Sequence, residues 1–376
     1  MTYKTIEYKE LYVRIKLSVY DAKGVTESHA IAENLNPALD AKTQYGNITQ
    51  ALDELQSVLP KGSILVMKRY FASDAINQAE LLPVENAAVS FVQQSPLNGS
   101  KVSLWAYWVC DCSMTTEGGT TIMERPHYRH FFNMQLHDDS NGGFEQTEKI
   151  FKRYEEELAN HNLSLKDNAI RTWIYVQGVD TNYAGMVEAR RRHFREQGLT
   201  ERTHYLASTG IEGKYLHPGT IVLADAYSIG NLLPGQVRYL KGSTHLNPTY
   251  EYGVTFERAT AMEYGDRRHV FISGTASIDN KGQIVHPLDV AGQTERTLEN
   301  ISVLLSEGRC SMNDVAQLIV YLRDTADYYP VSAYMEKHHP DIPKTIVYAP
   351  VCRPGWLVEM ECIAIKEIEN TDFPPF

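Results

Sequence analysis

The chain has 376 residues, which is too many for a single compact core and suits two domains of ordinary size. Hydrophobic residues make up 43% and charged residues 22% of the sequence, a composition that excludes a disordered or fibrous protein. The formal net charge of −11 argues against nucleic acid as a partner, because phosphate binding requires an electropositive face.

The N-terminal part of the chain has no feature of a membrane or secreted protein. Residues 1–7 contain no apolar core of the kind found in a signal peptide. The longest apolar runs, such as Val102 to Cys110, are far shorter than the roughly 20 residues of a membrane helix. Five cysteines are an odd number and indicate free thiols, not a disulfide framework. We therefore expect a soluble, cytoplasmic protein with no membrane partner.

Residues 110–142 are interpreted as an insertion in an N-terminal domain that also includes residues 1–60. The insertion carries His127, His130 and His137, and the pair Cys110 and Cys112 stands at its start. None of these has the further ligands nearby that a metal site requires. No metal and no cofactor is expected.

An internal repeat follows the insertion. Gln146-Thr147-Glu148-Lys149 recurs 147 positions later as Gln293-Thr294-Glu295-Arg296. In both copies apolar residues follow at the three-to-four spacing of a helix with one buried face. A strand, a second helix and a closing strand are then expected in each copy, at residues 173–176, 183–195 and 219–224, and again at 318–322, 329–338 and 355–360.

This order of elements predicts an α+β fold in which a mixed sheet with helices on one face occurs twice. The expected domains are residues 1–235, a divergent N-terminal copy with insertions, and residues 236–376, the C-terminal copy. The second helix of the first copy contains the basic run Arg190-Arg191-Arg192-His193, which is expected to be a solvated face.

The two copies differ in their closing strands. The first has Leu223 where the second has Glu359, which is flanked by Leu357, Val358 and Met360. Such an apolar setting raises the pKa of a carboxyl group and fits a proton donor. Side-chain alternation places Glu359 on one face with Leu357 and Glu361, so an ordinary exposed strand glutamate is the alternative.

Residues 253–366 resemble the RidA (YjgF) family. The resemblance rests on Phe271 to Ser277, Gln293 to Asn300 and the closing Leu357 to Ala364, which occur in the family's order and spacing. It implies a chorismate-mutase-like α+β fold, here as a tandem repeat, with a site where neighbouring domains meet. RidA domains form trimers, so we expect either a monomer or a homotrimer.

A narrower group, the chorismatases, is similar over most of the chain. The similarity is carried by Gln94 to Lys101, Ser208 to Gly213, Gly274 to Ser277, and Cys352 seven residues before Glu359. It implies an enzyme that splits chorismate into pyruvate and a hydroxylated ring acid, with Glu359 as catalytic acid. A cysteine at the position of Cys352 goes with an aromatic product, which favours 3-hydroxybenzoate and leaves 4-hydroxybenzoate and a dihydrodiol acid as alternatives. For Cys352 itself, a small core residue is the alternative.

One departure separates the subgroups. RidA deaminases hold a substrate carboxylate with an arginine in a Pro-x-Arg context, whereas this chain has Pro343-Lys344-Thr345. Lysine cannot reproduce the bidentate fork of arginine. Imine or enamine deamination is therefore the weaker alternative, beside a non-catalytic protein that binds a small metabolite.

The two carboxylates of chorismate require cations and backbone donors. Arg258, Lys344 and Arg353 are the expected cations, with surface ion pairs as the alternative for the two arginines. The turn of Gly274, Thr275 and Ala276 offers backbone N–H groups to an anion. The matching loop of the first copy is expected to close the site with Tyr205, Thr209, Gly210 and Tyr215. No histidine is placed to activate Cys352 as a nucleophile.

Overall fold

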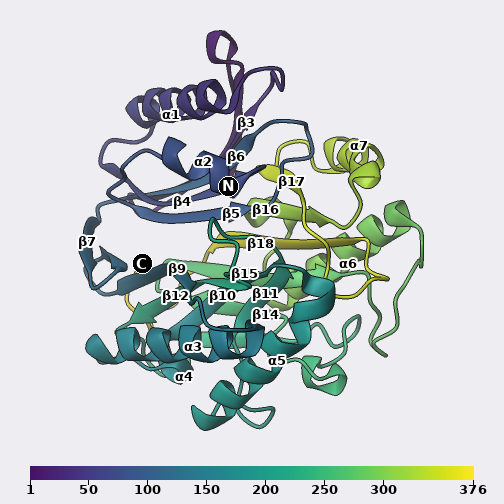
Figure 1. Ribbon diagram of the computed structural model, residues 1–376. Coiled ribbons are helices and arrows are strands. Elements are labelled where there is room, and N and C mark those ends of the chain that lie inside the picture. Colours follow the sequence, from purple (N-terminus) through teal and green to yellow (C-terminus); the bar gives the residue numbers. More distant parts are fainter.

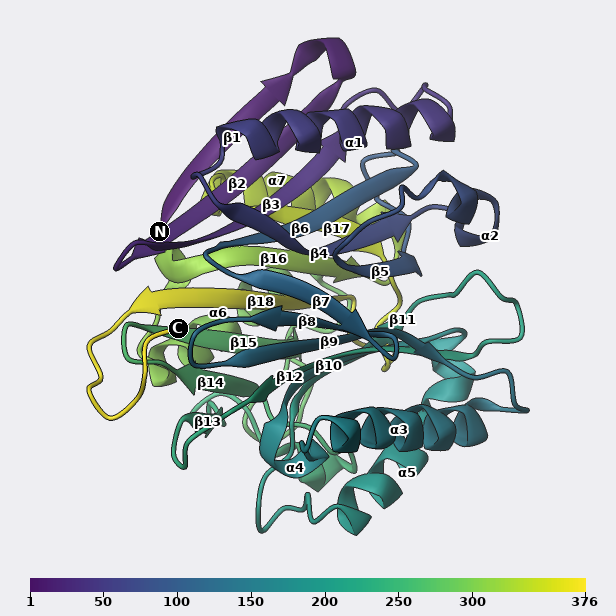
Figure 2. The ribbon, with the colours of Figure 1, turned by 90° about the vertical axis from the view of Figure 1, so that its left-hand side faces the viewer.

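The computed structural model describes residues 1–376 as three units, each built on one six-stranded mixed sheet (Figures 1 and 2). The first unit spans residues 2–110. Its elements are β1 (Thr2–Tyr8), β2 (Val13–Ala22), β3 (Val25–Asn34), α1 (Ala41–Val58), β4 (Ser63–Ala72), α2 (Ala75–Gln78), β5 (Ala88–Gln93) and β6 (Val102–Cys110).

The second unit spans residues 113–230 and the third spans residues 237–367. The second contains β7 (Ser113–Glu117), β8 (Thr120–Glu124), β9 (Arg129–His137), α3 (Gly143–Asn160), α4 (Leu165–Asn168), β10 (Ala169–Val176), α5 (Val179–Glu196), β11 (Ala207–Glu212) and β12 (Val222–Gly230). The third contains β13 (Val237–Leu240), a 3-10 turn (Thr249–Tyr252), β14 (Ala259–Glu263), β15 (Arg267–Ala276), α6 (Val290–Glu307), β16 (Val315–Leu322), α7 (Tyr328–His338), β17 (Lys344–Tyr348) and β18 (Val358–Glu367).

The three sheets have the same strand order. In each, an antiparallel meander of three strands is followed by the last strand of the unit and then by a parallel pair, as in β13-β14-β15-β18-β16-β17. The α+β prediction, with helices on one face of a mixed sheet, is confirmed. The expected insertion at residues 110–142 instead forms β7, β8 and β9, the meander that opens the second unit. Residues 1–235 therefore contain two units.

A buried glutamine links the long helix of each unit to its closing strand. The three residues are Gln44, Gln146 and Gln293, all fully buried. The Oε1 atom of Gln146 accepts from the N–H of Ile221 at 2.7 Å, and that of Gln293 accepts from the N–H of Leu357 at 2.8 Å. Because a buried amide needs partners on both of its ends, this glutamine fixes the approach to the closing strand in the same way each time.

The helices lie on the outside and the sheets face one another across a shared centre, with α1, α3 with α5, and α6 with α7 on three separate sides (Figure 1). The largest apolar cluster contains 59 buried residues and draws on all three sheets. Burial of this much apolar surface is the main stabilising contribution to the arrangement. No helix is long and apolar enough to cross a membrane.

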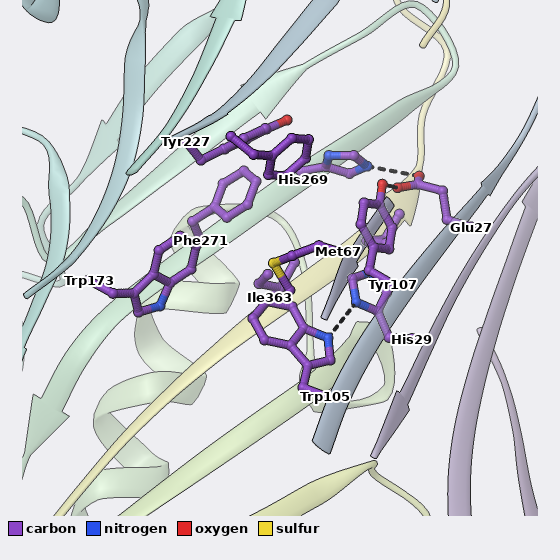
Figure 3. Close-up of a pocket in the computed structure, with 12 residues that line it drawn as sticks. Glu27, His29, Met67, Trp105, Tyr107, Trp173, Tyr227, His269, Phe271 and Ile363 are labelled. Atoms are coloured by element: carbon purple, nitrogen blue, oxygen red, sulfur yellow. Dashed lines mark hydrogen bonds and ion pairs between the residues drawn. The ribbon is translucent and has the colours of Figure 1, made fainter. Parts of the chain in front are cut away.

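Figure 3 shows an aromatic cavity where the three sheets meet. At its polar end the carboxylate of Glu27 accepts hydrogen bonds from Tyr107 at 2.6 Å and from His269 at 2.9 Å. Burial alone would raise the pKa of Glu27, but His269 and Arg267 hold it well below its usual range. Burial lowers the pKa of His29 to about 3, and the ring accepts from the indole N–H of Trp105. The polar groups of this cavity are hydrogen-bonded to one another, so we interpret the cavity as a structural centre at which the three sheets pack together.

Candidate active site

A second pocket lies at the boundary between the second and third units, and it contains Glu359. The space is about 510 Å³, counting its open mouth. The third unit supplies the end of β15, the start of β18 and the loops before β14 and β18. The second unit supplies α5 and β11. The lining residues on which the chemistry depends are Tyr183, Arg190, Ser208, Gly210, Tyr252, Phe256, Arg258, Gly274, Ala276, Cys352, Arg353, Trp356 and Glu359.

Glu359 is placed by the pairing of its strand. It stands second in β18, opposite Ala276 of β15 and Tyr321 of β16, and its side chain is 5% exposed. Burial raises its pKa to about 8, the nearby charge of Glu361 adds to the rise, and Arg171 and Arg258 oppose it. At neutral pH the group is therefore a protonated carboxylic acid that can give up a proton. The alternative of an exposed strand glutamate does not hold.

Cys352 faces the same pocket as a neutral thiol. Burial raises its pKa to about 12, and the carboxyl of Glu359 adds to this rise. A thiol with that pKa is almost entirely protonated at neutral pH and is a poor nucleophile.

The ring of Tyr183 lies close to Gly210. A Cβ at position 210 would come within 3.0 Å of that ring, so the glycine leaves room for the tyrosine.

Two buried arginines line the pocket without a carboxylate partner. Arg258 donates from Nε and Nη2 to the carbonyl of Asn247, at 3.2 and 2.9 Å. Arg190 is 1% exposed, and its Nε donates to Thr255 while its Nη1 donates to Ser208. The Nη2 of Arg190 has no partner. A buried cation that lacks a counterion is costly, so this corner favours an anionic ligand.

Arg353 stands at the mouth of the pocket. Its side chain is exposed, and its guanidinium lies 4.9 Å from the ring centroid of Tyr252 and 5.4 Å from that of Trp356. It is not paired with a carboxylate. The mouth is therefore cationic and walled by aromatic rings.

The basic run on α5 was predicted as a solvated face, and for Arg190 this is wrong. Successive helix positions point about 100° apart, so neighbouring arginines have different surroundings. The side chain of Arg192 is 60% exposed, whereas Arg190 follows Met186 and precedes Phe194 at intervals of four on the buried face. That apolar spacing is the pattern that identifies it. Tyr183, Tyr252 and Trp356 were not anticipated either, because no short motif marks an aromatic wall.

Two predicted binding residues lie elsewhere. Lys344 begins β17 at the boundary between the third and first units, where it and Lys16 both pair with Glu336 at 2.8 and 2.9 Å. Its ammonium group also donates to the carbonyl of His339, and Lys344 is not among the residues that line the pocket of Glu359. Tyr215 packs with His137, 4.5 Å between ring centroids, outside the pocket.

Three other predicted residues surround the pocket without lining it. Tyr205 is buried beside the loop before β14, and its N–H donates to Glu257 at 2.8 Å. Thr275 is fully buried and donates to the carbonyl of Ser273. Thr209 is buried behind Gly274, whose N–H donates to its hydroxyl at 2.9 Å. Gly210, Gly274, Ala276, Arg258, Arg353, Cys352 and Glu359 are the predicted residues that do meet in the pocket.

The fold is that of a known enzyme structure. A crystal structure of a chorismatase matches this one with a TM-score of 0.64 and 19% sequence identity, over 80% of this chain and 92% of that chain. The match covers far more of the chain than the C-terminal unit, so it includes strands of the N-terminal part.

Sequence comparison identifies the C-terminal unit. Residues 259–366 match the family described as Endoribonuclease L-PSP. A RutC family protein of Pyrococcus abyssi is 36% identical over 101 residues, covering 26% of this chain and 79% of that protein. The 3-aminoacrylate deaminase RutC of Acinetobacter baylyi is 31% identical over 97 residues, covering 25% of this chain and 77% of that protein. Through its third unit, the chain therefore belongs to the RutC family.

Proposed function

We propose that the protein cleaves the enolpyruvyl ether of chorismate, giving pyruvate and a hydroxybenzoate, with Glu359 as the general acid. The observation that carries this is a buried carboxyl, protonated at neutral pH, in a pocket whose arginines have no carboxylate partners. Chorismate is a dianion with a carbon that accepts a proton readily. The likeness of the fold to a chorismatase supports the same assignment.

The reaction starts with transfer of the Glu359 proton to the methylene carbon of the enol ether. The double-bond electrons form the new C–H bond, and the adjacent carbon becomes a cation that its ether oxygen stabilises. The low exposure of Glu359 keeps water away from the acid and strengthens its interaction with the developing charge. Arg190 and Arg258 hold the two carboxylates and so orient the methylene carbon towards the acid.

The group that attacks the cation decides the product. Attack by the substrate's own ring hydroxyl consumes no water, because pyruvate and hydroxybenzoate together contain all the atoms of chorismate. Attack by water gives a dihydrodiol acid and pyruvate. The pocket is lined by the neutral thiol of Cys352 and the rings of Tyr252 and Trp356, which disfavour bound water. This favours attack by the ring hydroxyl and therefore 3-hydroxybenzoate. In the route without water, the bond between the ring and the enolpyruvyl oxygen breaks, pyruvate leaves, and the proton that the ring loses on becoming aromatic returns to Glu359. In the hydrolytic route, the attacking water supplies that proton.

A second candidate is hydrolysis of an enamine, supported by the deaminase activity named for the relative from Acinetobacter baylyi. Both reactions begin with protonation of the double-bond carbon that is not attached to the heteroatom, so one acid serves either. They differ in the released fragment, which is pyruvate from chorismate and ammonia from an enamine. The two boundary arginines favour the larger dianion.

The test is incubation of the purified protein with chorismate, with pyruvate assayed enzymatically and ring acids separated by chromatography. Glu359→Gln removes the acid while keeping its shape, and Glu367→Gln at the exposed end of β18 is the matched control. We expect 3-hydroxybenzoate and pyruvate in equal amounts, lost in Glu359→Gln and kept in Glu367→Gln. If chorismate is unchanged while ammonia is released from 3-aminoacrylate, the deaminase is the right assignment.

A further inference from the structure

A buried carboxylate on the strand of Glu359 takes its hydrogen bonds from the second unit, and Arg69 of the first unit lies 3.8 Å from it. Glu361 lies two residues further along β18 and is 1% exposed. It accepts from Nη2 of Arg171 and from the indole N–H of Trp173, each at 2.7 Å, and from the hydroxyl of Thr209. All three donors cross the boundary between the units. The position of Glu361 on β18 therefore depends on how the second unit packs against the third.

The hydroxyl of Thr209 has a second connection that returns to the third unit. Besides donating to Glu361, it accepts from the N–H of Gly274 at 2.9 Å and from Arg171 at 2.6 Å. Its one proton and its acceptor capacity are all used. Gly274 lies against the carboxyl of Glu359 so closely that a Cβ there would overlap Oε1. The hydroxyl of Thr209 thus connects the carboxylate of Glu361 with the backbone of Gly274, and both of these lie next to Glu359.

The boundary between the first and second units contains the same kind of hydrogen bond, but it has no counterpart of the proton donor Glu359. Ser90 of β5 donates to Asp225 of β12 and accepts from Nε of Arg69, which also pairs with Asp225 at 3.2 Å. Asp225 lies two residues after Leu223, as Glu361 lies two residues after Glu359. Leu223 and Glu359 occupy matching places, opposite Tyr175 and Tyr321 in their sheets. A hydrogen bond from a hydroxyl to a carboxylate therefore occurs at both boundaries, beside Glu359 at one and beside Leu223 at the other.

We propose that Thr209 is a positioning residue for the proton transfer, acting by coupling the Glu361 carboxylate to the Gly274 turn across the boundary. This rests on the proposed role of Glu359 as the acid. Loss of the hydroxyl leaves the Gly274 N–H without its partner and Glu361 with one donor fewer. The turn then no longer fixes the Glu359 carboxyl in one place, and a small misplacement of a reacting group is costly in rate. The N–H of Gly274, released from Thr209 and lying against the Glu359 carboxyl, then becomes a donor to the ionised form of Glu359, which favours loss of its proton.

Thr209→Val removes the hydroxyl at constant shape, and Thr209→Ser retains it. We expect kcat of Thr209→Val to fall about tenfold or more with KM changed less than about twofold, while Thr209→Ser keeps most of kcat. The alkaline limb of the pH–rate profile is expected to move to lower pH in Thr209→Val only. Ser90→Ala is the matched control, because it deletes the equivalent bond beside Leu223. It is expected to lower Tm by a similar amount while leaving kcat and the alkaline limb unchanged.

A readout without substrate separates this proposal from the proposed function. The carboxyl stretching band of protonated Glu359, identified by its loss in Glu359→Gln, is followed by infrared difference spectroscopy as pH rises. If chorismate is not cleaved but the band titrates at lower pH in Thr209→Val than in wild type and Ser90→Ala, the positioning role stands and the proposed reaction falls. If chorismate is cleaved and Thr209→Val matches wild type in kcat and titration, Thr209 has no positioning role. Equal losses of kcat in Thr209→Val and Ser90→Ala also overturn it, because they would show a general structural effect.

Discussion

Gly274 forms the floor beneath Glu359: the carboxyl Oε1 occupies the space that a Cβ at position 274 would take. The close approach of a backbone to a functional side chain is one of the few situations in which only glycine fits. The floor is part of β15, and the side chain above it belongs to β18, two neighbouring strands of one sheet. The acid is therefore aimed by sheet geometry and not by a flexible loop.

Gly274→Ala is expected to lower kcat by about 100-fold or more, because the new methyl group displaces the carboxyl from its position over the substrate. Gly219→Ala is the control, since a Cβ at position 219 meets no atom within 4 Å and the backbone there needs no glycine. Steady-state kinetics and thermal unfolding of both variants provide the check. Normal kcat in a folded Gly274→Ala protein would contradict the placement of Glu359.

The activity is expected to decline above about pH 8, where Glu359 loses the proton that it must donate. A pKa raised on folding also affects stability. The folded state holds this proton more tightly than the unfolded state, so its contribution is present below the ordinary pKa of a glutamate and disappears as pH rises through about 8. Glu359→Gln lacks this dependence. The difference in Tm between the variant and wild type should therefore increase from pH 5 to pH 8 and level off above it, and a constant difference would contradict a raised pKa.

Arg190→Met is expected to raise KM for chorismate by about 10-fold to 100-fold, because it removes a buried cation that has no carboxylate partner of its own. The fold should tolerate the change, since an uncompensated buried charge is replaced by an apolar side chain of similar length. Arg192→Met on the exposed face of the same helix is the control and should leave KM unchanged. An unchanged KM in Arg190→Met would remove this arginine from the binding site.

Cys352→Ser is expected to keep pyruvate release while diverting part of the ring product to the dihydrodiol acid. A hydroxyl is smaller and more hydrophilic than a thiol and so admits water beside the cation. Chromatography of the ring acids measures the ratio, and Cys112→Ser, which changes a free cysteine that does not line the pocket, is the control. If Cys352→Ser abolishes pyruvate release altogether, the residue takes part in the proton transfer and not only in water exclusion.

The residues of the site that could be predicted from the sequence belong to short continuous motifs. Glu359, Cys352 and the turn at Gly274 belong to continuous family motifs, and each lies in the pocket. Lys344 is also local to such a motif, yet β17 is the outer strand of its sheet and meets a different neighbour. Which boundary a strand faces depends on how the units are arranged, and that arrangement is not written in any one segment.

The first unit illustrates a second limit. Its helix α1 shares the buried Gln44 with the other two units, but few of the surrounding residues correspond, so the repeat is visible in the strand order and not in the sequence. Arg190 shows a third limit, since a run of basic residues is usually solvated and only its spacing from Met186 and Phe194 indicates burial. Each of these cases depends on tertiary packing, which overrides the local pattern.

The identical strand order of the three units within one polypeptide has a consequence for how substitutions spread. In an assembly of three identical chains, any change of residue appears at all three boundaries at once. Here the place of Glu359 is taken by Leu223 in the second unit, and each boundary has its own set of side chains. One boundary is thus free to keep a costly buried acid, while the others use the same positions to hold the units together.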